Sequence, residues 1–121
     1  KSDLPFIIAE IKEKIIGFAY LSKFRDKSGY KFTFENSIYI DNDYVGKGVG
    51  SQLLKCLIEA ANKDSKIKTI IAVIGKKNSD LSIKIHQKNG FNIVGTLKKV
   101  GYKKNQWLDV IYMQKIFNEK N

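Results

Sequence analysis

The stretch "YIDNDYVGKGVGSQLLKCLIEAANK", residues 39–63, contains the strongest fold signal in this chain of 121 residues. Glycines occupy alternate positions 46, 48 and 50, between an apolar strand pattern and a helical apolar stripe that comprises Leu53, Leu54, Leu57, Ile58 and Ala61. A helix N-terminus has unpaired N–H groups and a partial positive charge, so it attracts anions. Glycine lets an anion approach the backbone closely. The stretch therefore predicts a strand–loop–helix unit with a pyrophosphate cradle at the start of the helix.

The two better-known phosphate-binding motifs do not match this loop. It lacks the G-x-x-x-x-G-K-[ST] pattern, and its G-x-G-x-G spacing differs from the dinucleotide pattern G-x-G-x-x-G. No acidic residue follows at the end of the next strand, where a ribose partner would lie. A tight strand-to-helix turn without a ligand is the alternative interpretation of the glycines.

The rest of the chain predicts a single domain of the α/β (α+β) class. Strands are expected at 6–11, 14–24, 32–40, 67–74, 91–97 and 107–116, and helices from residue 51 and from Ser79 or Asp80 to Asn89. Gly90 is placed to end the second helix in a left-handed conformation. Residues 98–106, "KKVGYKKNQ", are expected to form a long basic loop. The order β-β-β-α-β-α-β-β indicates a mixed sheet flanked by helices.

Composition limits the classes of function. The longest apolar run is too short to span a membrane. The one cysteine, Cys56, rules out an internal disulfide, suits a reducing cytoplasmic compartment, and lies on an apolar helix face as a small core residue. The net charge of +10 suits a polyanionic partner such as nucleic acid, anionic lipid or a phosphorylated cofactor. A solvated Lys-rich surface explains the same charge without any partner.

Several motifs together resemble the GNAT superfamily of acetyl-CoA-dependent N-acetyltransferases. They are the strand followed by "GKGVGSQLL" and the later segment "NSDLSIKIHQKNGF". The stretches "YKFTFENSIYID", "IIAVIGKKNSDLSIKIHQKNGF" and "TLKKVGYKKNQWLDVIYMQK" are similar to the phosphinothricin and methionine sulfone or sulfoximine acetyltransferase group. The resemblance covers about Phe6 to Phe117 and implies the GNAT fold, with a central, mostly antiparallel mixed sheet.

The chain departs from the family pattern in two places. Val45 stands where family members usually have Arg or Gln, three residues before the middle glycine. Because backbone N–H groups are expected to make the main pyrophosphate contacts, cofactor binding should survive this change. Family members also begin with a further strand and two helices that cover the acceptor site. These elements are expected to be missing from a chain that starts at Lys1.

The resemblance implies two catalytic residues. Glu35 matches the family's general base, which takes a proton from the substrate amine through a water. His86, the only histidine, lies late in the second predicted helix, where it would act as acid or second base. The alternatives are an exposed strand glutamate and a surface or structural histidine. The resemblance implies direct transfer in a ternary complex, without a covalent intermediate on the protein and without a metal.

The resemblance also implies how acetyl-CoA is bound. The pantetheine arm is expected along the backbone of Ile38, Tyr39 and Ile40, and near Asn78 and Ser82. The pyrophosphate is expected at a cradle that comprises Gly46, Lys47, Gly48, Val49, Gly50 and Ser51. A turn or cap role is the alternative for Asn78.

The acceptor site is predicted from the segment "KFRDKSGYKF". Phe24, Arg25 and Tyr30 resemble positions that border the amino-acid site, and a guanidinium can hold a carboxylate by two hydrogen bonds. An exposed loop arginine is the alternative. Tyr102 and Trp107 fit three places equally: the acceptor site, a dimer interface or the core.

The sequence therefore predicts an acetyl-CoA-dependent N-acetyltransferase that modifies the amino group of a small amino-acid-like compound, in a cytoplasmic homodimer. A protein or ribosomal-protein N-acetyltransferase is the alternative within the enzyme class. A basic, non-catalytic GNAT-fold domain that binds nucleic acid or regulates another protein is the alternative outside it. Against nucleic acid, the aromatic residues fall in strand patterns and are expected to lie in the core instead of forming an exposed stacking platform.

Overall fold

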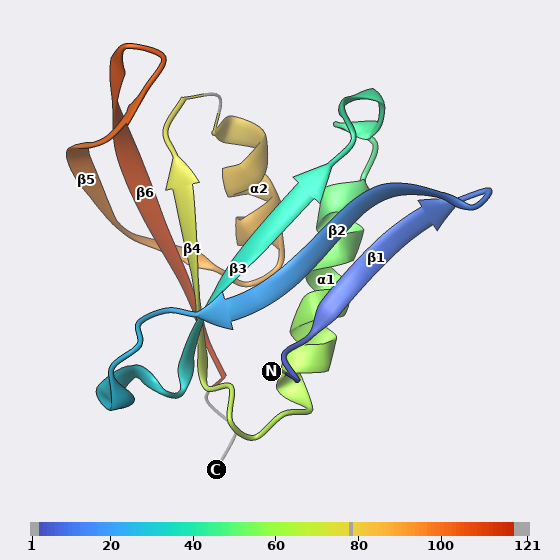
Figure 1. Ribbon diagram of the computed structural model, residues 1–121, viewed down its shortest axis with the longest axis horizontal. Coiled ribbons are helices and arrows are strands. Elements are labelled where there is room, and N and C mark those ends of the chain that lie inside the picture. The colour runs from blue at the N-terminus through green and yellow to red at the C-terminus, as the bar shows by residue number, and fades with distance from the viewer. Residues whose placement is uncertain (1–2, 78, 118–121) are drawn as a thin grey trace.

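The computed structural model describes residues 3–77 and 79–117. It contains six strands and two α-helices in the predicted order (Figure 1). The elements are β1 (Phe6–Ile11), β2 (Lys14–Lys23), β3 (Thr33–Ile40), α1 (Val49–Asn62), β4 (Thr69–Gly75), α2 (Asp80–Lys88), β5 (Asn92–Lys103) and β6 (Gln106–Ile116), with short 3₁₀ turns at Ser28–Tyr30 and Asn42–Tyr44. In this described part of the chain neither α-helix is long and apolar enough to cross a membrane.

All six strands form one sheet, in the order β1-β2-β3-β4-β6-β5. Only the β3–β4 pair is parallel, and the other neighbouring pairs are antiparallel. The prediction of a mixed, mostly antiparallel sheet is therefore confirmed. The crossover from β3 to β4 contains α1, as a parallel connection requires.

Both helices lie on the same face of the sheet. On β3, Asn36 hydrogen-bonds to His86 of α2, and Ile40, which points to the same face, lies against Gly50 of α1. The core between sheet and helices includes the predicted α1 stripe, with Leu54 and Leu57 fully buried, together with Ile70 and Met113 from the central strands. The sheet thus has a helix-covered face and a second, uncovered face in the described structure.

The parallel pair β3–β4 separates part-way along its length. Pairing includes only three positions and ends at Glu35 and Ile71, although β3 continues to Ile40 and β4 to Gly75. Figure 1 shows the two strands diverging above this point, with α2 beside the gap. The divergence exposes backbone along β3 and creates an opening in the sheet.

The prediction of a long basic loop at 98–106 is wrong. β5 continues through most of this segment, with an irregularity between Leu97 and Gly101, and only Lys104 and Asn105 form the turn to β6. The Asp109 carboxylate accepts a 2.9 Å hydrogen bond from the N–H of Lys99, whose φ of 52° marks the bulge. β5 is an edge strand, where lysines are common because they discourage pairing with other chains, so its composition resembles that of a loop.

Candidate active site

The glycine loop adopts a backbone conformation that favours glycine. Gly46 and Gly48 have φ values of 81° and 88°, in the left-handed region, and a Cβ at either position would meet no atom within 4 Å. Gly48 is the N-cap of α1 and makes no side-chain cap hydrogen bond. The N–H groups of the first turn therefore face open space, as an anion site requires.

Gly50 has a different reason to be glycine. A Cβ there would lie 2.7 Å from Cδ1 of Ile40 and 3.1 Å from Cδ1 of Ile85, distances shorter than normal van der Waals contact. Gly50 thus allows α1 to approach both β3 and α2. The alternate spacing of the glycines combines a conformational requirement at 46 and 48 with a packing requirement at 50.

A hollow of about 220 Å³ lies between the glycine loop and α2. Gly46, Gly48 and Ser51 line one side, and Lys84 and Lys88 line the other. Sequence analysis missed these two lysines, although their spacing of four residues places them on one helix face. The two lysines supply positive charge opposite the cradle. Val45, which stands where family members usually have Arg or Gln, supplies none.

Lys47 was predicted to belong to the cradle, but its side chain does not line this hollow. Its ammonium lies 5.8 Å from the centre of the Tyr44 ring, and the residue borders a separate groove between β1 and α1. Ser51, by contrast, lies as expected, and its hydroxyl accepts a 3.3 Å hydrogen bond from the Asn89 side chain.

A second cavity, of about 350 Å³, occupies the opening between β3 and β4. Five residues predicted for catalysis or cofactor binding line it, and they are Glu35, Ile38, Tyr39, Ser82 and His86. Ile40 lies further along β3 and lines the glycine hollow instead. Asn78 lies outside the described residues. The structure thus brings together residues of β3 and α2, which are distant in the sequence.

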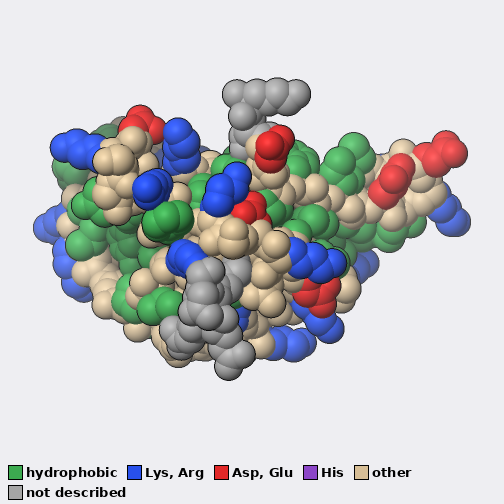
Figure 2. Space-filling model, turned by 90° about the horizontal axis from the view of Figure 1, so that it is seen from below, with side chains coloured by type: hydrophobic (Ala, Val, Ile, Leu, Met, Phe, Trp, Pro, Cys, Tyr) green, Lys and Arg blue, Asp and Glu red, His purple; other side chains and the backbone are tan. Residues whose placement is uncertain are grey.

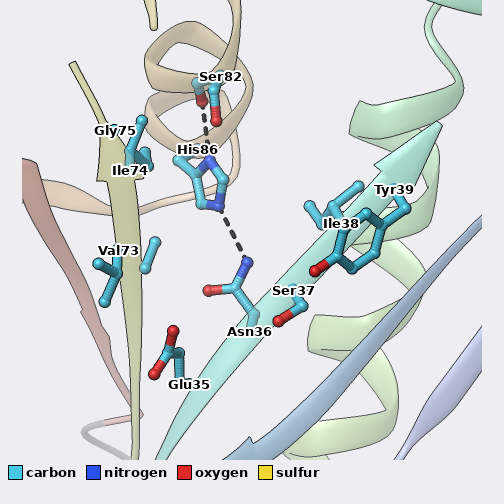
Figure 3. Close-up of a pocket in the computed structure, with 11 residues that line it drawn as sticks. Glu35, Asn36, Ser37, Ile38, Tyr39, Val73, Ile74, Gly75, Ser82 and His86 are labelled. Atoms are coloured by element: carbon cyan, nitrogen blue, oxygen red, sulfur yellow. Dashed lines mark hydrogen bonds between the residues drawn. The ribbon is translucent and has the colours of Figure 1, made fainter. Parts of the chain in front are cut away.

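Glu35 and His86 reach the opening from different sides of the sheet. Glu35 alternates with Phe34 and Asn36, whose side chains are buried toward the helices, so its half-buried carboxylate belongs to the uncovered face. Figure 3 shows this carboxylate directed toward β4 near the point where the strands meet, and His86 entering from α2. The opening therefore presents groups from both faces of the sheet.

His86 is buried and hydrogen-bonded at both ring nitrogens. Nδ1 lies 2.8 Å from the carbonyl oxygen of Ser82, and Nε2 lies 3.0 Å from Nδ2 of Asn36. The Phe91 ring packs edge-on against the imidazole at 5.0 Å. Burial lowers the pKa of His86 below its ordinary value of 6.5 because the charged form loses its hydration, despite the opposing hydrogen bond to Ser82. The imidazole is therefore neutral at pH 7.

Asn36 also lines the opening, and it was not predicted from the sequence. It is 7% exposed and contacts His86, and its amide oxygen is buried without a hydrogen-bond partner. An unpaired buried oxygen costs about 1–3 kcal/mol. The available signal was a polar residue at an inward-facing position of a strand whose neighbours Phe34 and Ile38 are apolar.

The predicted acceptor residues lie together, but away from the opening. The rings of Phe24 and Tyr30 are 6.0 Å apart, and the Arg25 guanidinium lies 4.4 Å from the Phe24 ring. These residues belong to the β2–β3 connection, at the end of β3 where it pairs with β4, and none of them lines the opening.

Tyr102 and Trp107 are not core residues. They are 60% and 62% exposed, and their rings contact each other at 4.9 Å near the tip of the β5–β6 hairpin. The predicted core position for Cys56 also changes, since this residue is only partly buried and borders the groove between β1 and α1. That groove shares no lining residue with the opening, so Cys56 is not placed to act as its nucleophile.

Basic side chains are dispersed on the surface in view. On the face drawn in Figure 2, Lys and Arg side chains alternate with apolar and acidic ones and do not merge into a single patch. Positive charge is thus dispersed on this face, and the two lysines that line the hollow beside the glycine loop are a local feature.

Comparison with known proteins decides the family. The sequence model of the acetyltransferase (GNAT) domain matches residues 1–112. This chain belongs to the GNAT acetyltransferase family. The fold class and the family resemblance predicted from the sequence are therefore confirmed.

Two curated GNAT relatives have related activities. The phosphinothricin N-acetyltransferase of Alcaligenes faecalis is 39% identical over 95% of this chain and 58% of its own length. The L-methionine sulfoximine/L-methionine sulfone acetyltransferase of Pseudomonas paraeruginosa is 36% identical over 91% of this chain and 63% of its own length. The chain thus spans about three-fifths of the relatives that it matches.

Two solved GNAT structures superimpose closely. The phosphinothricin acetyltransferase of Sinorhizobium meliloti, solved with acetyl-CoA, has a TM-score of 0.90 and 35% identity, covering 98% of this chain and 63% of the other. The ribosomal-protein-alanine N-acetyltransferase of Brucella melitensis has a TM-score of 0.89 and 38% identity, covering 94% and 69%.

Proposed function

We propose that this GNAT chain uses acetyl-CoA to acetylate the amino group of a small amino-acid-like compound of the phosphinothricin or methionine sulfone type. The observation that carries the proposal is that the same two elements line both cavities. β3 and α2 line both the glycine hollow and the opening. A ligand with a diphosphate in one part and a thioester at its end matches this arrangement, and acetyl-CoA has that form.

The residues that would hold acetyl-CoA follow from this placement. The N–H groups at the start of α1, with Lys84 and Lys88 opposite, would bind the diphosphate. The backbone of β3 beyond Glu35 remains paired with β2 but not with β4, so its N–H and C=O groups on the β4 side could bind the pantetheine arm as a further strand would. Acetyl-CoA supplies an activated thioester, which an amine can attack directly.

Glu35 is the proposed general base. Its carboxylate lies on the uncovered face of the opening, where it would take a proton from the substrate ammonium through one water. The free amine then attacks the thioester carbonyl, a β3 N–H stabilises the developing oxyanion, and the thiolate leaves as the carbon–sulfur bond breaks. The nitrogen loses its second proton to solvent or to the thiolate.

The sequence indicated an acid or second-base role for His86. An acid would need a proton on Nε2, which the neutral ring lacks, and Asn36 already donates to that nitrogen. We therefore assign proton removal to Glu35 and treat His86 as a neutral group that organises the helical wall of the opening.

The test is release of coenzyme A thiol from acetyl-CoA in the presence of phosphinothricin, methionine sulfone or methionine sulfoximine. The expected result is amine-dependent release that falls by a factor of about 10²–10⁴ in Glu35→Gln. Glu59→Gln, an exposed change on α1, is the control and should retain activity. Binding of acetyl-CoA without release for any amine would refute the proposal.

A protein substrate is the second candidate, favoured by the similarity to the Brucella structure. Acetylation of a peptide with an N-terminal alanine, at a higher kcat/KM than any amino-acid analogue, would favour it.

We also propose a homodimer in the cytoplasm, as the family resemblance implies. The exposed Tyr102–Trp107 pair at the hairpin tip supports a contact there. Sedimentation of the wild type and of Trp107→Ser tests the contact, and an unchanged dimer in the variant would exclude this pair from it.

A further inference from the structure

A buried hydrogen-bonded chain connects α2 to β3 inside the opening. A carbonyl oxygen can only accept, so the short contact to Ser82 places the ring proton of His86 on Nδ1. An amide NH₂ group can only donate, so Asn36 meets a lone pair on Nε2. The two contacts together select the neutral Nδ1–H tautomer (Figure 3).

The same contacts determine the direction of the Asn36 amide. Because Nδ2 faces the histidine, the oxygen faces away from it, and Figure 3 shows it turned across the opening toward β4. This oxygen is buried and has no hydrogen-bond partner. Rotating the amide would bring its oxygen against the lone pair of Nε2, and two acceptors repel. The unpaired oxygen is therefore a consequence of the neutral imidazole.

The position of the Asn36 oxygen suits a hydrogen bond from the N–H or O–H group of a ligand. Asn36 is 7% exposed and His86 is 4% exposed, so few solvent molecules can reach the pair. Both residues line the cavity in the opening. Buried acceptors in native proteins almost always have a donor. A ligand that enters the opening can supply it.

We propose that Asn36 is a positioning residue that also contacts substrate: its NH₂ group holds His86 as the neutral tautomer, and its amide oxygen accepts a hydrogen bond from an N–H group of a bound substrate. The identity of that substrate rests on the proposed acetyl transfer. Two N–H groups fit the chemistry, an amide of the pantetheine arm and the amine of the acceptor. Asn36 points to the helical side of the opening and Glu35 to the uncovered side, and the kinetic test below distinguishes the two donors.

Nitrogen-15 NMR of His86 tests the first half and needs no enzymatic activity. The sequence has one histidine, so its ring signals are assigned directly. In the wild type at pH 7, Nδ1 should carry the proton and Nε2 should be unprotonated and hydrogen-bonded. Asn36→Asp replaces the donor with an acceptor of the same shape and should convert the ring to imidazolium. Gln87→Glu adds the same charge at the adjacent exposed position and should leave the ring neutral.

A second variant covers the case in which Asn36→Asp does not fold. Asn36→Leu has a similar volume and no donor, so the Nε2 resonance should move toward that of an unbonded nitrogen. A proton on Nε2 in the wild type, or the same Nε2 resonance in the wild type and the leucine variant, would overturn the assignment.

Steady-state kinetics of Asn36→Leu tests the second half. Loss of one hydrogen bond should raise one Michaelis constant by up to about tenfold. A rise in KM for acetyl-CoA identifies the pantetheine amide, and a rise in KM for the amine identifies the acceptor. No change in either constant overturns the substrate contact. Calorimetry of acetyl-CoA binding distinguishes this outcome from failure of the proposed function. If the wild type does not bind acetyl-CoA, the proposed acetyl transfer itself is wrong; if it binds, only the Asn36 contact is wrong.

Discussion

Replacing Gly48 with Glu tests whether the glycine loop binds a diphosphate. Gly48 caps α1, and a side chain there would enter open space that borders the hollow. A carboxylate about 5 Å from a phosphate charge, at an effective dielectric constant of about 20, opposes binding by about 3 kcal/mol. This energy corresponds to a loss of about a hundredfold in affinity for acetyl-CoA. Isothermal titration calorimetry measures it directly.

The glutamate also strains the backbone, and a matched variant separates the two effects. With φ at 88°, any non-glycine residue at position 48 costs about 1–2 kcal/mol of folding free energy. Gly48→Gln has the same strain and nearly the same shape without the charge. Both variants should unfold at a similarly reduced urea concentration, but only Gly48→Glu should lose about a hundredfold in affinity.

Two results would refute this reasoning. Equal losses of affinity in Gly48→Glu and Gly48→Gln would mean that side-chain bulk or backbone strain weakens binding at the start of α1. Repulsion between the carboxylate and a phosphate would then not be the cause. Unchanged affinity in both variants would place the diphosphate elsewhere. Gly95→Glu adds the same side chain to open space on β5 and should bind acetyl-CoA as the wild type does.

Three further predictions concern charge, burial and pH. Changing both Lys84 and Lys88 to Gln should weaken acetyl-CoA binding several-fold at low salt, and a difference that does not shrink at high salt would exclude charge as the cause. Leu54→Ala should lower the free energy of unfolding by about 2–5 kcal/mol, whereas Leu97→Ala, at an exposed position, should change it by less than about 1 kcal/mol; equal losses in urea titrations would contradict the core assignment. The unfolded chain binds a proton at His86 below pH 6.5, and the folded chain, whose pKa is lower, does not. The free energy of unfolding should therefore fall as the pH is lowered from 6.5. The fall should be steeper in the wild type than in His86→Gln by up to about 1.4 kcal/mol per pH unit. Parallel curves of unfolding free energy against pH would show that the ring is not held neutral.

Much of the element order could be predicted because the apolar periodicity is strong. The strand at 6–11 and the helical stripe after the glycines agree with β1 and α1, and Gly90 has the expected positive φ of 92°. The second half of the edge strand β5 could not be predicted, since its lysines and the bulge held by Asp109 interrupt the alternation. The local apolar pattern does not predict a strand where a side chain distant in the sequence stabilises an irregular backbone.

The candidate site shows the same division. Sequence analysis selected Glu35, His86 and the glycines by their motif positions, and the structure places Glu35 and His86 around one opening. It missed Asn36, because the local signal, a polar residue between the apolar residues Phe34 and Ile38, does not reveal a partner on a helix fifty residues later.

Residue order alone determined the family, the alternation of strands and helices, and the need for glycine at the start of α1. These features depend on backbone conformation and on apolar spacing over a few residues, which are local properties. Only the tertiary structure decided that β3 and β4 separate beyond Glu35, that the Gly50 position is set by packing against Ile40, and that the His86 ring is neutral. These features depend on contacts between segments distant in the chain, where burial and the direction of each hydrogen bond are set by the whole fold.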